Sequence, residues 1–295
     1  MKIKHATIYV LRIPFLESFS HAAKTRVFSD SIIVRLTTEN EIVGYGEGVP
    51  RPYVTGENVE SSLRYMQDYL WPEIAKSDFS ELSSSLDIDH CLSIIDRRFD
   101  YEKPSGIIAW NASEAAFELA LIDCFLKEQK NSLSKILPPK RSNVTYSGVI
   151  TAGPKEKAVQ IAKYFKMLGV RQMKIKINGE SDRERILAVR EIMGDGVSIR
   201  IDANGTFSLD EAVNVLNELS DIRLECVEQP IARGSILDLA KLKSEISIPI
   251  MADESLVTFD DAEQLISLNA CDFFNLRISK CGGICKTLRL AELAN

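Results

Sequence analysis

Short apolar runs alternate with helical patterns over the second half of the chain. The runs are TYSGVIT, MKIKI, SIRID, LECVE, SIPIMAD and DFFNLRIS. The segments between them place apolar residues at helical spacing, and several end at a glycine. Short apolar strands that alternate with helices predict an α/β fold with a parallel sheet. Only six βα units fit, whereas a closed TIM-like barrel needs eight, so we expect an incomplete (β/α) barrel.

The first part of the chain has a different pattern. Residues 2–14 and 31–36 resemble strands, and the glycines of EIVGYGEGVP indicate a hairpin return. Helical patterns follow over about residues 59–75, 86–97 and 109–129. The consecutive Pro138 and Pro139 cannot continue a helix. We therefore predict an N-terminal α+β domain over residues 1–130, a linker over 131–141 and the partial barrel over 142–295.

Charged residues stand at the ends of five of the apolar runs. They are Lys176, Asp202, Glu228, Asp253 and Lys280, separated by 26, 26, 25 and 27 residues. This interval is the length of a strand, a loop and a covering helix. Because the C-terminal ends of all strands in a parallel barrel open onto one face, we expect these side chains to converge on one site.

The three carboxylates in this set predict a metal site. Asp202, Glu228 and Asp253 offer hard oxygen ligands, and no histidine or cysteine accompanies them. Such a donor set favours Mg²⁺, or Mn²⁺, over zinc. A single acidic residue after a strand commonly caps the next helix. Three at one period favour a shared site instead.

The lysines supply the second half of the predicted site. Strand side chains alternate faces, so Lys174 and Lys176 point the same way, and Lys280 is expected on the opposite side of the barrel. Two ammonium groups inside an apolar strand require partners. Lysines that flank a carboxylate bound to Mg²⁺ can remove and return an α-proton, because the ion stabilises the enediolate. The ion and Lys174 would also lower the pKa of Lys176.

Composition limits the class of partner. The 295 residues are 45% apolar and 26% charged, with a net charge of −6. This charge disfavours nucleic acid and anionic membranes, which select basic surfaces. No uncharged stretch is long enough to span a bilayer, so a cytoplasmic enzyme of small molecules is expected. The six cysteines show no disulfide framework spacing.

These motifs together resemble those of the enolase superfamily. KIKIN, RIDANGTF, ECVEQP, ADES and NLRISKCGG are similar to the second to sixth barrel strands of its muconate lactonizing enzyme branch. That branch includes muconate cycloisomerases, dipeptide epimerases, N-acylamino acid racemases and o-succinylbenzoate synthases. The segments GYGEGVPRPYVTGE and Phe19–Arg26 resemble loops of its N-terminal capping domain, which close over the substrate.

The resemblance implies a role for each residue. It implies an Mg²⁺-dependent isomerase that acts through an enediolate, as a racemase or epimerase or as a cycloisomerase. Lys176 and Lys280 would be the acid/base pair, with Lys174 as the electrostatic neighbour. The metal ligands would be Asp202, Glu228 and Asp253. Residues expected to contact the substrate or support the ligands are Asn204, Glu254, Arg26 and Tyr53.

The chain departs from the branch because no seventh or eighth strand follows. We therefore expect open sheet edges, a homo-oligomer or a poorly soluble chain, and partly uncovered side chains at Arg200, Cys226 and Met251. An alternative function is a truncated, catalytically inactive relative that acts as a fragment or binding module. A Schiff-base aldolase on a similar barrel explains the lysines, but it leaves the carboxylates without a role.

Overall fold

The structure, a computed structural model, describes residues 1–21, 24–84, 88–179 and 181–294. The chain forms two compact units. The first unit comprises Met1–Pro14, Phe28–Ser142 and Leu276–Asn295, and the second comprises Phe15–Val27 and Asn143–Asn275. This division differs from the predicted boundaries in two places, because residues 15–27 group with the second unit and residues 276–295 with the first.

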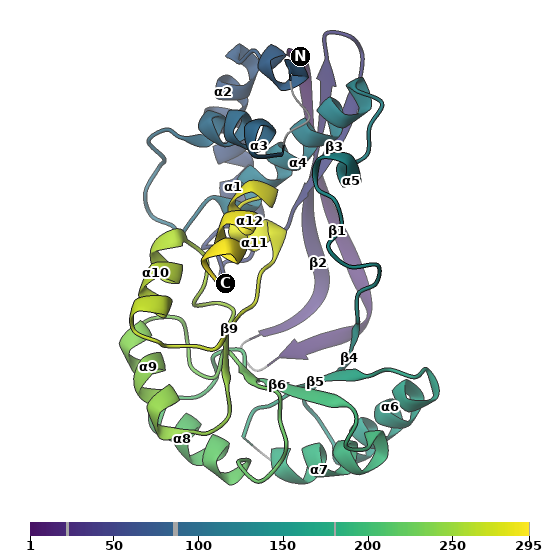
Figure 1. Cartoon of the computed structure of the whole chain (residues 1–295), viewed down its shortest axis with the longest axis vertical. Coiled ribbons are helices and arrows are strands. Elements are labelled where there is room, and N and C mark those ends of the chain that lie inside the picture. Colours follow the sequence, from purple (N-terminus) through teal and green to yellow (C-terminus); the bar gives the residue numbers. More distant parts are fainter. Residues whose placement is uncertain (22–23, 85–87, 180, 295) are drawn as a thin grey trace. The chain divides into compact units, whose positions relative to one another are not determined.

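The second unit is built on a parallel sheet. Its six strands follow the order of the chain: β4 (Ser147–Ile150), β5 (Gln172–Lys176), β6 (Ser198–Asp202), β7 (Val227–Glu228), β8 (Ile250–Ala252) and β9 (Phe273–Phe274). Figure 1 shows their connecting helices on the outer side of the strands: α6 (Lys155–Met167), α7 (Asp182–Met193), α8 (Leu209–Glu218), α9 (Ile236–Glu245) and α10 (Phe259–Ser267). The predicted α/β fold with an incomplete barrel is confirmed.

The sheet is open within the described residues, with β4 and β9 at its edges. Val149 on β4 and Phe273 on β9 are 42% and 43% exposed. Arg200 and Met251 are half-buried, as expected for an open sheet. The expectation for Cys226 is wrong, because this residue is fully buried. Burial raises the pKa of the Cys226 thiol to about 12.

The first unit combines helices with an antiparallel sheet, apart from the parts of β1 and β2 within residues 15–27, which group with the second unit. The strands lie in the order β1 (Ile3–His21), β2 (Lys24–Thr38) and β3 (Val43–Gly48), with β2 and β3 antiparallel. The helices are α1 (Val59–Tyr65), α2 (Trp71–Lys76), α3 (Ile88–Asp96), α4 (Asn111–Glu128), α5 (Leu133–Ile136), α11 (Ile278–Cys281) and α12 (Ile284–Leu293). A π-helical turn over Met66–Leu70 joins α1 to α2, and short 3₁₀ helices cover Ser80–Ser84 and Arg97–Phe99.

Polar side chains of α4 fix the C-terminal helices in the first unit. The Asn111 amide donates a hydrogen bond to the carbonyl oxygen of Lys280, at 2.7 Å. The buried Glu118 carboxylate accepts hydrogen bonds from the backbone N–H groups of Ile284 and Cys285 at the start of α12. These N–H groups have no partner inside their own helix, so the carboxylate satisfies them and favours the positive end of the helix dipole.

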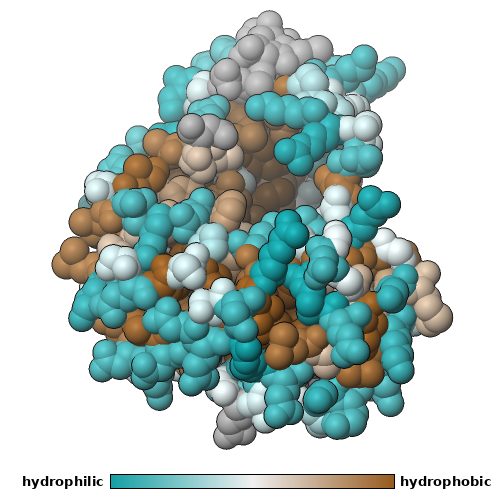
Figure 2. Space-filling model, turned by 60° about the horizontal axis from the view of Figure 1, so that its bottom comes forward, coloured by the Kyte–Doolittle hydropathy of each residue, from teal (hydrophilic) through white to brown (hydrophobic). Residues whose placement is uncertain are grey.

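Hydrophilic residues cover much of the face shown in Figure 2, with apolar residues in patches between them. Several of the exposed apolar side chains belong to the outer helices, such as Met167 on α6 and Leu237 on α9. None of the described helices is both long enough and apolar enough to cross a membrane.

The glycines of β3 allow a close approach to α4. Gly44, Gly46 and Gly48 share the buried face of the strand. A Cβ atom at Gly46 would lie 2.0 Å from the carbonyl oxygen of Ala116. The hairpin turn that these glycines were expected to make is formed earlier, where the Thr38 N–H donates to the Ile42 carbonyl. Their role is therefore in packing, since any side chain would push the helix away from the sheet.

This packing gives a stability prediction. Gly46→Ala should destabilise the chain by about 3 kcal/mol, because the added methyl overlaps backbone atoms that cannot move alone. Urea denaturation measures the difference. Gly196→Ala is the matched control, since a Cβ there meets no atom within 4 Å. Equal denaturation midpoints for the two variants would contradict the packing argument.

Candidate active site

The register of the parallel strands aligns three of the predicted residues. Lys176 on β5 pairs with Asp202 on β6, and Asp202 pairs with Glu228 on β7. All three residues end their strands, and all three are buried. Because neighbouring strands lie about 4.8 Å apart, side chains at paired positions on one face are in contact range. The sheet therefore brings an ammonium group and two carboxylates together at its C-terminal edge.

Lys174 lies on β5, two residues before Lys176, and it also contacts these carboxylates. Its Nζ lies 2.7 Å from Asp202 Oδ2 and 2.8 Å from both oxygens of Glu228. Burial lowers the pKa of Lys174, but the charges and hydrogen bonds of Asp202 and Glu228 outweigh burial and raise this pKa overall. Two carboxylates with no solvent exposure thus converge on one cation.

Lys176 is held by two predicted site residues. Its Nζ donates to Asp202 Oδ2 at 2.7 Å and also to Asn204 Oδ1. The Asn204 amide nitrogen donates to Glu254 Oε1 at 3.3 Å, and its backbone N–H donates to Asp202 Oδ1 at 2.9 Å. Asn204 therefore orients the lysine, an aspartate and a glutamate from three different strand ends.

Asp253 follows β8 directly and lies outside the strand ladder. Glu228 pairs with Met251, which precedes Asp253 by two residues. Among the described residues, no group of three or more histidine, cysteine, aspartate or glutamate side chains is arranged to hold a metal ion. Asp202 and Glu228 converge on the ammonium group of Lys174. The role of Asp253 as a third ligand stays a prediction.

The remaining predicted residues are Lys280, Tyr53 and Arg26. Lys280 belongs to the first unit and is buried on α11, because β9 ends at Phe274 and the chain turns into a helix four residues later. Tyr53 is half-buried in a turn of the first unit. The side chain of Arg26 lies outside the described part of the chain. The proposed roles of these three residues stay predictions.

Asn275 and Gln229 were not among the predicted site residues, although both touch the network. The Asn275 amide donates to Glu228 Oε1 at 2.8 Å. Gln229 is fully buried and its side chain bonds to the backbone of Asp253. Arg200, predicted only as an interior residue, has its Nε 3.8 Å from Glu228 Oε2. The sequence could have indicated Asn275 and Gln229 by their positions, since Asn275 follows β9 and Gln229 follows Glu228 directly.

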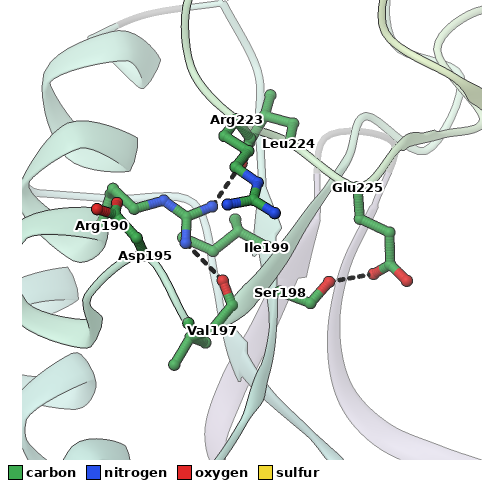
Figure 3. Close-up of a pocket in the computed structure, with 9 residues that line it drawn as sticks. Arg190, Asp195, Val197, Ser198, Ile199, Arg223, Leu224 and Glu225 are labelled. Carbon is green, nitrogen blue, oxygen red and sulfur yellow. Dashed lines mark hydrogen bonds between the residues drawn. The ribbon is translucent and has the colours of Figure 1, made fainter.

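A pocket of about 270 Å³ lies at the opposite end of the strands, where β6 begins at Ser198. Figure 3 shows Arg190 and Arg223 side by side in it. The Arg190 guanidinium donates to the carbonyl oxygens of Gly194, Val197 and Arg223, and Ser198 Oγ donates to Glu225. These bonds connect the loops before β6 and β7. We therefore interpret the residues of this pocket as stabilising the sheet.

Comparison with known proteins identifies the family. Residues 156–295 match the family described as enolase C-terminal domain-like. A hydrophobic dipeptide epimerase of Enterococcus faecalis is 30% identical over 297 residues, which cover 99% of this chain and 79% of that protein. The chain belongs to the enolase superfamily. An N-succinyl-L-Arg/Lys racemase of Bacillus cereus is 28% identical, with 100% of this chain and 77% of that protein covered.

A solved structure agrees with this assignment. The crystal structure of a dipeptide epimerase from Cytophaga hutchinsonii, complexed with Mg and the dipeptide D-Ala-L-Val, matches with a TM-score of 0.84 and 29% identity. The match covers 100% of this chain and 77% of that one. The predicted resemblance to the muconate lactonizing enzyme branch is confirmed, and with it the capping domain and partial barrel. Within the enolase superfamily this chain is an isomerase, like its named epimerase and racemase relatives.

The charge pairing in this enolase superfamily member gives a second prediction. Lys174→Met should lower the free energy of unfolding of the metal-free chain by about 3 kcal/mol, because it leaves buried carboxylates without their shared partner. Urea denaturation measures this loss. The control is Lys163→Met, at an exposed position on α6, which should change stability little.

The same prediction has a pH signature. Because the folded pKa of Lys174 lies above its ordinary value of 10.5, its stabilisation is complete below that pH. The stabilisation is lost as the pH rises through the raised folded pKa. The difference in stability between the unsubstituted chain and Lys174→Met should therefore shrink at strongly alkaline pH. A difference that stays constant there would contradict the assigned pairing.

Proposed function

We propose that this enzyme is an Mg²⁺-dependent racemase or epimerase that removes and returns the α-proton of a small carboxylate substrate. One observation carries the proposal. Lys176 is 8% exposed at the C-terminal end of β5 and is held by Asp202 and Asn204, beside two carboxylates that converge on a cation. A buried and oriented amine is suited to take a proton from a bound carbon acid.

The donor set supports Mg²⁺ as the cofactor, with Mn²⁺ as its substitute. Asp202 and Glu228 already place carboxylate oxygens within 2.8 Å of a single cationic nitrogen. Carboxylate oxygens are the ligands that Mg²⁺ prefers, and Asp253 would supply the third. When bound, the ion would stabilise the negative charge of the enediolate that forms as the proton leaves.

The lysines would divide the proton transfer between them. Lys176 would hold the proton on one face of the α-carbon and Lys280 on the other, so that the two exchange roles with the direction of the reaction. Lys174, fixed between Asp202 and Glu228, would set the electrostatic environment.

The other predicted residues would orient the substrate and the catalytic groups. Asn204 and Glu254 would keep Lys176 in place through their shared hydrogen bond. Arg26 and Tyr53 would contact the substrate.

The relatives support a particular substrate class. One is named for dipeptides and another for N-succinyl amino acids. A peptide bond and an N-succinyl group both acylate an α-nitrogen. We therefore place the substrate among α-amino carboxylates with an acylated nitrogen, for which 1,1-proton transfer is the reaction, and we favour this over cycloisomerisation.

The proposal also covers the partners, the oligomeric state and the cellular location of the enzyme. The net charge of −6 supports a small-molecule partner rather than nucleic acid or a membrane. The exposed apolar side chains at Val149 and Phe273 on the sheet edges support a homo-oligomer. We place the enzyme in the cytoplasm.

The metal assignment can be tested by calorimetry. Mg²⁺ should bind with 1:1 stoichiometry, and Asp202→Asn or Glu228→Gln should each weaken binding by about 100-fold, because a neutral amide donates less charge to a hard cation. The control is Asp221→Asn, at an exposed position that pairs with Arg183 away from the strand ends. Unchanged affinity in both site variants would refute the metal site.

The lysine roles can be separated in D₂O. With an N-acylated amino acid substrate, Lys176→Ala and Lys280→Ala should each slow stereochemical inversion by about 10³-fold, because each removes one acid/base group. Each single variant can retain exchange of the α-proton of one enantiomer, which nuclear magnetic resonance detects. Exchange that continues undiminished in the double variant would exclude both lysines.

A further inference from the structure

We infer that Gln229 is a positioning residue for the loop that carries Asp253 and Glu254. This inference rests on the proposed function, in which Asp253 is a metal ligand. Gln229 follows Glu228 directly and has no solvent exposure. It does not touch the substrate in this scheme, and it acts through the backbone of the loop after β8.

The side chain of Gln229 is fully engaged by that loop and its own. Its Oε1 accepts hydrogen bonds from the backbone N–H groups of Asp253, at 3.1 Å, and Ser255, at 2.9 Å. Its Nε2 donates to the Ser255 hydroxyl at 2.7 Å and to the Ile231 carbonyl at 2.8 Å. An amide side chain has two acceptor sites and two donor hydrogens, and all four are used here.

The backbone of Gln229 connects three strand ends. Its N–H donates to the Met251 carbonyl on β8 at 2.9 Å, and its carbonyl accepts from the Gly205 N–H after β6 at 2.7 Å. Its φ of +40° lies in the left-handed region, which non-glycine residues rarely adopt. Such a conformation persists only where the surroundings hold it, and the six hydrogen bonds of this residue do so.

The position of Asp253 depends on this residue because the strand pairing stops before it. Ladder bonding along β8 reaches Ala252, whose carbonyl accepts from the Asn275 N–H. The next N–H, that of Asp253, bonds to the side chain of Gln229 instead of a strand. Gln229 thus replaces the ladder at the point where the loop must hold a carboxylate in a fixed place.

A substitution can remove these bonds with little change in volume. Gln229→Met has nearly the length of glutamine and forms none of the four side-chain hydrogen bonds. In the metal-free full chain, hydrogen–deuterium exchange over residues 252–256 should become at least 10-fold faster, while exchange in α9 stays unchanged. The dissociation constant for Mg²⁺, measured by calorimetry, should rise about 10- to 100-fold, as for other residues that orient metal ligands.

Two control variants isolate the positioning role. Ser255→Ala removes the hydroxyl that Nε2 reaches, but it keeps both bonds to Oε1, so Mg²⁺ affinity should change less than 3-fold. Leu239→Ala opens a cavity under α9, where Leu239 is 1% exposed, and it should lower the melting temperature without changing Mg²⁺ affinity.

The outcomes separate this inference from the proposed function. If Gln229→Met lowers the melting temperature but leaves exchange over residues 252–256 at the unsubstituted rate, the residue is only structural and the inference fails. If the unsubstituted chain binds no Mg²⁺, the proposed function fails, and the exchange measurement in the metal-free chain still decides whether Gln229 holds the loop.

Discussion

The ion pairing of Lys174 with Asp202 and Glu228 is the interaction on which the C-terminal edge of the sheet depends. Both carboxylates have no solvent exposure, and removing an isolated carboxylate from water costs several kcal/mol. One ammonium group within 2.8 Å of both offsets that cost. The strand register must therefore be kept, because a shift by one residue would turn one partner to the other face of the sheet.

The sequence predicted this part of the site because the chain interval matches the ladder there. Lys176, Asp202 and Glu228 are paired in the sheet, and they are spaced at 26 residues. The similar interval predicted Asp253 at the end of the next strand, and this residue does follow β8 directly, although the ladder pairs Glu228 with Met251. Loop and helix lengths are read from a sequence, whereas register is set by how the crossover helix packs. An interval therefore identifies the end of a strand, but it does not show which residues of neighbouring strands are paired.

Long-range packing limited the prediction in the first unit. Residues 276–295 follow the last strand in sequence, yet Asn111 and Glu118 on α4 bind their backbone groups. Nothing local in the sequence distinguishes these two side chains from other polar residues of a helix. The glycines of β3 were recognised, but their function was not, because the helix that approaches them begins more than 60 residues later.

The site and the irregular backbone coincide for a physical reason. Asn204 and Gln229 have φ values of +48° and +40°, and they follow Asp202 and Glu228 by two residues and one residue. A left-handed non-glycine residue costs about 1–3 kcal/mol. A regular strand would continue its ladder there and would carry the next side chains away from the edge. Turning sharply instead lets Asn204 reach Lys176 and Gln229 reach Asp253, so the hydrogen bonds that hold the polar groups also offset the strain that brings them together.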